Sequence, residues 1–303
     1  MEVEEALKDT TEQDDLLTPD FLRKIERLSL VAKRVFPGRT RGERRSTKRG
    51  ASVEFADYRN YTPGDDFRRV DWNVYARLEK VFLKLFVEEE DLHVHILLDA
   101  SRSMDFGSPK KFLYARRVAA ALSYIALANL DRVGLAVLNA GTAATLSPKR
   151  GKQSAFAVFD WLKSVSASGQ TQLADALRDF SLKTARPGLA IVISDFFDPE
   201  YQKGLSALLS RKFEVTLMHV LDREEVAPQI VGDLLLVDSE TNERREITVT
   251  QTLLRKYQHR LSEFCADIEN FSARYGCNYV RVTNESSFED LILSYLRRRG
   301  MVK

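Results

Sequence analysis

The sequence predicts an α/β fold with a mainly parallel sheet and helices on both faces. Three observations lead to this prediction. Short apolar runs at 94–98, 133–138, 189–194 and 214–221 are typical of strands buried on both faces. Amphipathic segments of helical period lie between these runs, and strands that alternate with helices form parallel sheets. The chain of 303 residues is long enough for one large domain or two modest ones.

Composition narrows the class of protein. A hydrophobic content of 44% and a charged content of 30% are those of an ordinary globular protein. The formal net charge of +2 gives the whole molecule no bias toward polyanions. Cys265 and Cys277 lie outside any ligand-like cluster, and no signal-peptide pattern follows Met1. We therefore expect two reduced thiols in a cytoplasmic protein. No stretch approaches the ~20 apolar residues of a membrane span.

The N-terminal part differs from the α/β pattern. Residues 1–17 are acidic and lack an apolar period, which predicts a flexible tail. Thr18-Pro19 provides an N-cap followed by proline at the first position of a helix. Residues 80–88 alternate between apolar and other side chains, which predicts a strand. We expect a helix, loop and strand extension over 18–91, followed by the α/β domain over 92–303.

Further elements are predicted within the α/β domain. They are helices after Ser108-Pro109 and at 154–165, 173–182, 199–209 and 250–275, a hairpin over 234–249, a strand over 278–282, and a terminal helix from Ser286. Gly276 follows the longest helix in the C′ position that favours glycine. The spacing Ser286-x-x-Glu289 is typical of a capping box.

The first apolar run ends in Asp-x-Ser-x-Ser, formed by Asp99, Ser101 and Ser103. A carboxylate and two hydroxyls on one turn are hard oxygen donors, which suit Mg²⁺, Mn²⁺ or Ca²⁺. Ligands of open α/β sheets bind at the carboxyl ends of the strands, where this turn lies. Because Asp and Ser are also common turn residues, a plain polar turn is the alternative.

This spacing resembles the metal-adhesion motif of the von Willebrand factor A family. That family adds a Thr from a second loop and an Asp from a third, and the matching positions here are Thr171 and Asp195. The resemblance implies a Rossmann-like von Willebrand factor A domain that binds a divalent cation, with Mg²⁺ expected and Mn²⁺ or Ca²⁺ as alternatives. The two carboxylates, Asp99 and Asp195, would not overcompensate such an ion, so it could attract a third carboxylate from a partner.

A second segment, residues 50–77, mixes acids, arginines and aromatic residues around a Pro-Gly turn. Arg–carboxylate pairs and stacked rings can hold such a segment together. It closely resembles the signature of the uncharacterised family called domain of unknown function number 58, where it precedes a von Willebrand factor A-like domain. The signature residues are Glu54, Asp57, Tyr58, Arg59, Tyr61, Gly64, Asp65, Asp66, Arg68, Asp71, Trp72 and Arg77. They shape a partner surface or brace the structure.

The resemblance also implies a role. Members of that family resemble partners of MoxR-type AAA+ ATPases, which implies a non-enzymatic adaptor in the assembly or activation of client proteins. Many relatives carry hydrophobic N-terminal helices. This sequence shows none, so membrane anchoring is not expected.

A basic run offers a different function. Its cationic residues are Arg39, Arg41, Arg44, Arg45, Lys48 and Arg49. They could bind the phosphates of nucleic acid or of anionic lipid. We favour a solvated loop, or one that pairs with acidic segments of the same chain, because no aromatic residues interleave with the basic ones for base stacking.

Enzymatic activity has little support. A strand that ends in Asp also resembles the haloacid dehalogenase phosphatases, which need a second Asp two residues on. Position 101 is Ser, so a metal-dependent phosphohydrolase is the weaker alternative. His93 and His95 share a strand face without a third ligand near them in sequence, and no catalytic set at a motif spacing emerges. We therefore expect no enzyme.

Overall fold

The chain divides into two compact units. The computed structural model describes residues 16–32, 54–63, 65, 67, 70–87, 92–139, 144–170, 172–238, 241–298 and 300–303. The large unit comprises residues 1–33 and 92–303, and the small unit comprises residues 34–91.

A six-stranded sheet forms the centre of the large unit among its described residues. In chain order the strands are β3 (His93–Asp99), β4 (Arg132–Leu138), β5 (Thr145–Arg150), β6 (Leu189–Ser194), β7 (Glu214–Leu221) and β10 (Asn278–Thr283). Their spatial order is β10-β7-β6-β3-β4-β5, and only the β4–β5 pair is antiparallel. The central strands are buried almost throughout, as their apolar runs predict. The predicted α/β class is confirmed.

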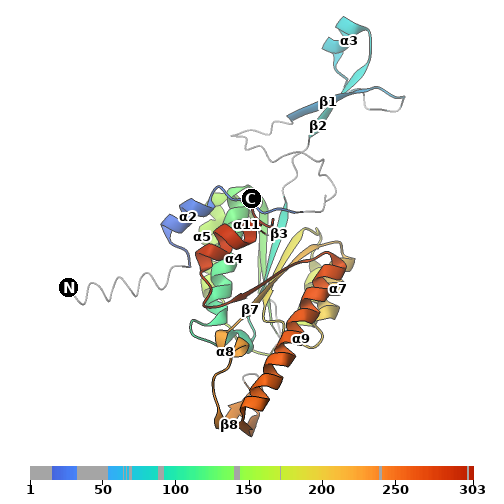
Figure 1. Cartoon of the computed structure of the whole chain (residues 1–303). Coiled ribbons are helices and arrows are strands. Elements are labelled where there is room, and N and C mark those ends of the chain that lie inside the picture. The colour runs from blue at the N-terminus through green and yellow to red at the C-terminus, as the bar shows by residue number, and fades with distance from the viewer. Residues whose placement is uncertain are drawn as a thin grey trace, which may run out of the picture. The chain divides into compact units, whose positions relative to one another are not determined.

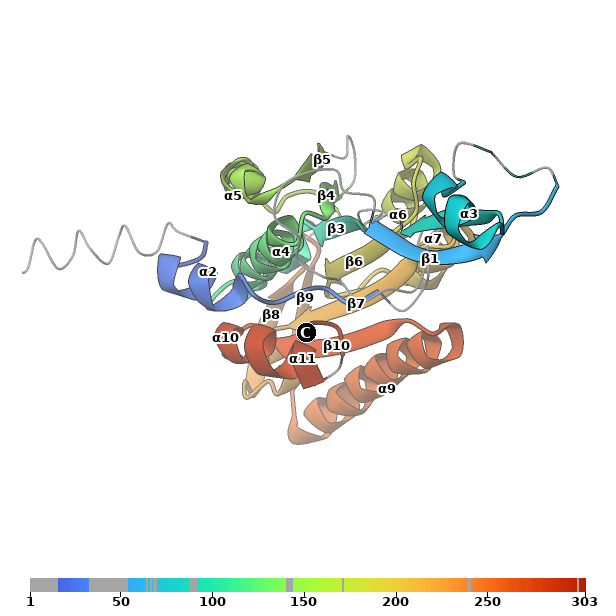
Figure 2. The same cartoon turned by 90° about the horizontal axis from the view of Figure 1, so that it is seen from above.

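Helices cover both faces of this sheet. The described helices and helical turns of the large unit are α2 (Pro19–Ile25), the 3₁₀ turn η2 (Arg102–Asp105), α4 (Lys111–Ala128), η3 (Lys152–Ser154), α5 (Ala155–Ser164), α6 (Leu173–Lys183), α7 (Tyr201–Ser210), α8 (Arg223–Val226), α9 (Gln251–Tyr275) and the consecutive turns α10 (Phe288–Asp290), η4 (Leu291–Tyr295) and α11 (Leu296–Arg298). Helices α4 and α5 lie on one face, and α6, α7 and α9 lie on the other (Figure 2). Within the described ranges, no helix combines the length and apolarity that crossing a membrane requires.

Two predicted features of the C-terminal part are confirmed. Strands β8 (Gly232–Val237) and β9 (Arg244–Val249) form the expected hairpin, which leads into α9 (Figure 1). Gly276 ends α9 in the left-handed conformation, with φ of 70°. The terminal helix differs in its cap, because the Ser287 hydroxyl accepts from the Asp290 N–H at 3.3 Å. The Ser286 hydroxyl instead lies 2.9 Å from that of Thr283.

One strand of the sheet was not predicted. β5 has no apolar run, contains Pro148 and exposes most of its side chains. It pairs with β4 along one side only, at the edge of the sheet, where a residue without an N–H is tolerated. The edge position therefore explains why an apolar pattern could not reveal this strand.

The N-terminal helix belongs to the large unit, whereas we assigned it to the extension. The ring of Phe21 lies 5.0 Å from that of Phe288 at the other end of the chain. Leu16 and Leu17, which we expected in the flexible tail, are buried. Apolar side chains of α2 and of the preceding turn are thus covered by tertiary contacts that the sequence pattern does not reveal.

The small unit contains an antiparallel pair of strands and a short helix. Strand β1 (Glu54–Asn60) pairs with β2 (Phe82–Val87), the strand predicted over 80–88, and α3 (Trp72–Leu78) lies between them in sequence. The basic run over 39–49 lies outside the described residues.

Acid sensitivity is expected from His95 in β3. Its Nε2 donates to the carbonyl oxygen of Arg186 at 3.2 Å, and burial lowers its pKa to about 4. Because the unfolded chain binds a proton near pH 6.5 that the folded chain excludes, this contribution to stability is present above pH 6.5 and is lost as the pH falls toward 4. Between pH 7 and pH 5, urea unfolding should show a loss about 2 kcal/mol larger for the wild type than for His95→Gln. His259→Gln, at an exposed helix position, is the control. Equal acid sensitivity of the wild type and His95→Gln would contradict the assignment.

Candidate functional site

The carboxyl ends of two neighbouring strands carry the predicted carboxylates. Asp99 is the last residue of β3, and Asp195 directly follows β6, the strand that pairs with it. The Ser194 hydroxyl donates to Oδ2 of Asp99 at 2.6 Å, and the Ser101 N–H donates to its Oδ1 at 2.9 Å. All four residues are buried. The sheet thus brings together two acids that are 96 positions apart in the sequence.

The hydroxyls of the motif lie on the same turn. The Oγ atoms of Ser101 and Ser103 are 3.0 Å apart. The loop before α6 lies beside this turn, because Ser168 donates its N–H to Ala100 and Gly169 accepts from the N–H of Arg102. The predicted ligand Thr171 belongs to the same loop, but it lies outside the described residues. The structure therefore groups four of the five predicted ligands.

A buried lysine, Lys111, pairs with Asp195 of this group, and the sequence analysis missed it. Lys111 is the first residue of α4 and has no exposed surface. Its Nζ donates to Oδ2 of Asp195 at 2.8 Å and to Oε1 of Glu225 at 2.6 Å. The same ammonium lies 5.3 Å from the centroid of the Phe197 ring. We call Asp99, Asp195, Glu225 and Lys111 the charge cluster.

Burial and charge act together on the charge cluster. Burial and the neighbouring negative charge of Asp195 raise the pKa of Asp99 to about 7. Burial opposes protonation of Lys111, but Asp195 and Glu225 outweigh it, so the lysine pKa is raised and the ammonium is retained. Three carboxylates and one ammonium leave two net negative charges when all are ionised. The cluster can therefore accept further positive charge.

The donors suit a hard divalent cation. Carboxylate and hydroxyl oxygens at the turn are the ligand types that Mg²⁺ and Ca²⁺ prefer, and the two excess negative charges equal the charge of one such ion. No set of three or more His, Cys, Asp or Glu side chains in the described part of the chain is placed to hold a metal. A site here would therefore depend on the hydroxyls of Ser101 and Ser103. The residues fit the ion in chemistry and charge, although Asp195 is already paired with Lys111.

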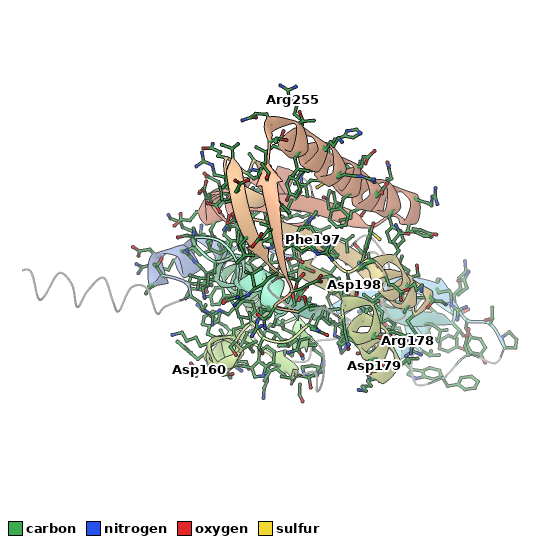
Figure 3. The ribbon with its side chains drawn as sticks, turned by 90° about the horizontal axis from the view of Figure 1, so that it is seen from below. Asp160, Arg178, Asp179, Phe197, Asp198 and Arg255 are labelled. Atoms are coloured by element: carbon green, nitrogen blue, oxygen red, sulfur yellow. The ribbon has the colours of Figure 1, made fainter. Side chains whose placement is uncertain are left out.

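The residues around the charge cluster divide into structural and exposed ones. Asp198 has a structural role, since its carboxylate accepts from the N–H groups of Ala174 and Glu200 at 2.9 and 2.8 Å. Phe197, its neighbour at the end of β6, is 39% exposed, and Phe106 after η2 is 44% exposed. Figure 3 shows Phe197 and Asp198 next to each other in the view from below.

An apolar groove lies beside the charge cluster. It has a volume of about 680 Å³ and runs between α8, the β8–β9 hairpin and the start of α9. Phe106 and Glu225 line it together with Leu236, Ile247 and Leu253. Because Glu225 also contacts Lys111, the groove and the charge cluster share one side chain. An apolar surface thus adjoins a group of buried charges.

Two acidic residues of the family signature form hydrogen bonds within the small unit. Asp71 caps α3 by accepting from the N–H groups of Asn73 and Val74, and it also accepts from the Tyr58 hydroxyl at 2.8 Å. Asp65 accepts from Arg59 at 2.6 Å and from the hydroxyl and N–H of Thr62. These bonds support the interpretation of the signature as a brace.

Other signature residues are exposed or undescribed. Trp72 is 59% exposed on α3, Arg77 is exposed on the same helix, and the ring of Tyr61 stacks on that of Phe67 at 5.3 Å. Gly64, Asp66 and Arg68 lie outside the described residues, as do the side chains of Glu54 and Asp57 in β1. The exposed aromatic side chains leave room for a partner-binding role beside the brace.

The sequence analysis missed Glu225 and Lys111, and only Glu225 has a recognisable sequence pattern. Asp222-x-x-Glu225 has the spacing of a capping box, and the structure shows both of its bonds at the start of α8. Lys111 follows another lysine and gives no sign of burial. Its neighbour Lys110 is exposed and pairs with Asp105 at 2.9 Å. Only the fold distinguishes the two lysines.

Three solved structures are among those that are similar to this chain. BatB from Bacteroides thetaiotaomicron has 18% identity and a TM-score of 0.44, covering 69% of this chain and 98% of its own. An aerotolerance-related membrane protein from Bacteroides fragilis has 17% identity and a TM-score of 0.44, covering 68% and 99%. The SpRpn10 VWA domain has 11% identity and a TM-score of 0.40, covering 67% and 94%. The fold of this chain itself, with a mainly parallel sheet between two helical layers, is Rossmann-like.

The sequence has relatives in mycobacteria. The uncharacterized protein Rv1480 of Mycobacterium tuberculosis is 28% identical over 295 residues, which covers 94% of this chain and 92% of the relative. The uncharacterized protein MAV169 of Mycobacterium avium is 30% identical over 131 residues, covering 42% of this chain and 77% of the relative. The sequence model of the protein family of unknown function DUF58 matches residues 57–263. This match spans more than half of the chain and includes most of the signature, the metal motif and Asp195, and the chain therefore belongs to the DUF58 family.

Proposed function

We propose that this chain is a non-enzymatic protein-binding module that acts in the cytoplasm as an adaptor of a MoxR-type AAA+ ATPase. The proposal is carried by the arrangement of side chains at the carboxyl ends of β3 and β6. There a buried charge cluster adjoins the exposed rings of Phe106 and Phe197 and the apolar groove. Exposed apolar surface next to fixed charge is typical of a surface that binds another protein.

A divalent cation belongs to the proposal, with Mg²⁺ as the expected ion and Mn²⁺ or Ca²⁺ as alternatives. Asp99, Ser101 and Ser103 would hold it, with Thr171 and Asp195 as the remaining candidates. When bound, such an ion supplies a positive charge that a carboxylate of the partner can approach. The hydrogen bonds from Ser194 and Ser101 orient the Asp99 carboxylate at this turn.

The signature contributes a second surface to the proposal. Its acids stabilise the small unit from within, whereas Trp72 and Phe67 expose most of their rings. Large exposed aromatic side chains are enriched at the centres of protein interfaces. Contacts of the ATPase or of a client protein with α3 are therefore part of the proposed role.

The test measures binding of the MoxR-type ATPase of the same organism to the immobilised full chain. Because Mg²⁺ also serves the ATPase, variants are compared at one fixed concentration of Mg²⁺ and nucleotide. Asp99→Asn removes a charge at the motif with little change in volume, and we expect at least roughly tenfold weaker binding, about 1.4 kcal/mol. The matched control is Asp160→Asn, because Asp160 is exposed on α5 and apart from Phe197 and Asp198 (Figure 3).

Two results would count against this function. Equal binding by Asp99→Asn and wild type would show that the carboxyl ends of β3 and β6 are not part of the interface with the ATPase. Absence of binding by the wild type would remove the ATPase as partner. Thermal unfolding of each variant in EDTA and in Mg²⁺ shows whether it is folded and whether the ion binds the native state, since such an ion raises the midpoint.

A further inference from the structure

The charge cluster contains a cation of its own. Lys111 is as deeply buried as Asp195, and its ammonium donates to Asp195 at 2.8 Å and to the half-buried Glu225 at 2.6 Å. Phe197 covers the same ammonium with its ring. A buried ammonium persists only when it is paired, so these contacts explain why a lysine is tolerated at this position.

Asp195 is therefore a candidate partner for two cations, the Lys111 ammonium and a divalent ion. It is the carboxylate that matches the third part of the metal motif, and it already shares an oxygen with Lys111. A divalent ion near the Asp99 turn would meet the positive charge of that ammonium across a buried site, where charge–charge repulsion is stronger than in water. The two cations cannot both be close to Asp195 without cost.

We infer that Lys111 is an internal cation that competes with a divalent ion for Asp195 and thereby keeps the metal affinity of this chain low. The inference rests on the proposed metal site and names the residue that regulates it. In the chain without a metal, the ammonium balances Asp195 and keeps the sheet edge assembled. When an ion binds, Asp195 turns from the ammonium to the ion or to its water shell.

Glu225 makes this exchange possible. It contacts Lys111 from α8, whereas Asp195 follows β6, so the lysine retains one carboxylate when it gives up the other. The capping box holds Glu225 in place, since its Oε2 accepts from the Asp222 N–H at 2.7 Å. Glu225 also lines the apolar groove, so a shift of Lys111 toward it connects the metal site with the proposed partner surface.

The experiment titrates Mn²⁺ alone, followed by calorimetry and by the thermal unfolding midpoint. Lys111→Met removes the ammonium and keeps most of the apolar stem, and we expect it to bind Mn²⁺ at least tenfold more tightly than wild type. Lys110→Met, the same change at the exposed neighbour, should bind as wild type does. Because the single change leaves Asp195 and Glu225 without their cation, Lys111→Met/Glu225→Gln serves as a second variant that restores the net charge of the cluster. It should also bind more tightly than wild type.

The outcomes separate this inference from the proposed function. Tighter binding by both Lys111 variants, with Lys110→Met unchanged, supports competition. Equal affinity of a folded Lys111 variant and the wild type would overturn the inference while leaving the metal site in place. Failure of every variant to bind Mn²⁺ would overturn the metal site and the inference together. The adaptor role is judged separately, by the binding of the ATPase to Asp99→Asn.

Discussion

Replacing Lys111 with methionine is expected to lower the free energy of unfolding by about 3–5 kcal/mol in metal-free buffer near neutral pH. The ammonium is buried between Asp195 and Glu225, and its removal leaves two carboxylates without their cation. Removal of one partner of a buried pair costs more than the pair itself contributes, because an uncompensated charge stays in the interior. Urea unfolding in EDTA, followed by circular dichroism, measures the change.

Its control is the same change one position earlier. Lys110 pairs with Asp105 at the surface, with 57% of its side chain exposed, so Lys110→Met should change stability by less than about 0.5 kcal/mol. The double variant Lys111→Met/Glu225→Gln should recover part of the loss. Stability of Lys111→Met within 1 kcal/mol of the wild type, roughly the effect of an ordinary substitution, would show that the ammonium does not hold the sheet edge.

Replacing Gly188 with alanine should cost about 3 kcal/mol, because the added methyl group has no space. A Cβ at this position would lie 2.1 Å from the carbonyl oxygen of His93, in the strand that pairs with β6. This oxygen belongs to the backbone of β3, so it cannot relieve the overlap by a side-chain rotation. The start of β6 would have to move from β3, and the carbonyl of Gly188 also accepts from the N–H of Glu214 at 3.0 Å.

A second glycine of the sheet provides the comparison. Gly134 lies within β4, where an added Cβ would meet Pro148 at 3.5 Å, an ordinary contact. Gly134→Ala should therefore stay within about 1 kcal/mol of the wild type. Thermal unfolding of both variants under one buffer condition tests the difference. Similar midpoints for Gly188→Ala and Gly134→Ala would contradict a steric cause.

The large unit shows which patterns were sufficient for prediction. The buried strands β3, β6 and β7 have continuous apolar runs, and amphipathic periods predicted the helices between them. These signals are local, because a strand covered on both faces needs apolar side chains at nearly every position. β5 lacks such a run, since it lies at the edge and contacts one neighbour, and it could be found only in the assembled sheet.

The candidate site divides in the same way. Asp99, Ser101 and Ser103 lie within five positions, so their spacing alone indicates oxygen donors on one turn. Asp195 follows a recognisable strand, and parallel strands end at the same edge of a sheet. Lys111 has no such pattern, because Lys110 has the same chemistry, and the capping-box spacing of Glu225 does not indicate its contact with Lys111.

By itself, the sequence of this protein determined the α/β class, the order of its main strands and helices, and the turn that carries the oxygen donors. Only the tertiary structure decided that Lys111 meets Asp195, 84 positions away, and Glu225, 114 positions away. Local patterns report how one segment is covered by its surroundings. The pairing of buried charges depends on which segments the sheet brings together, and burial determines how strongly those charges interact.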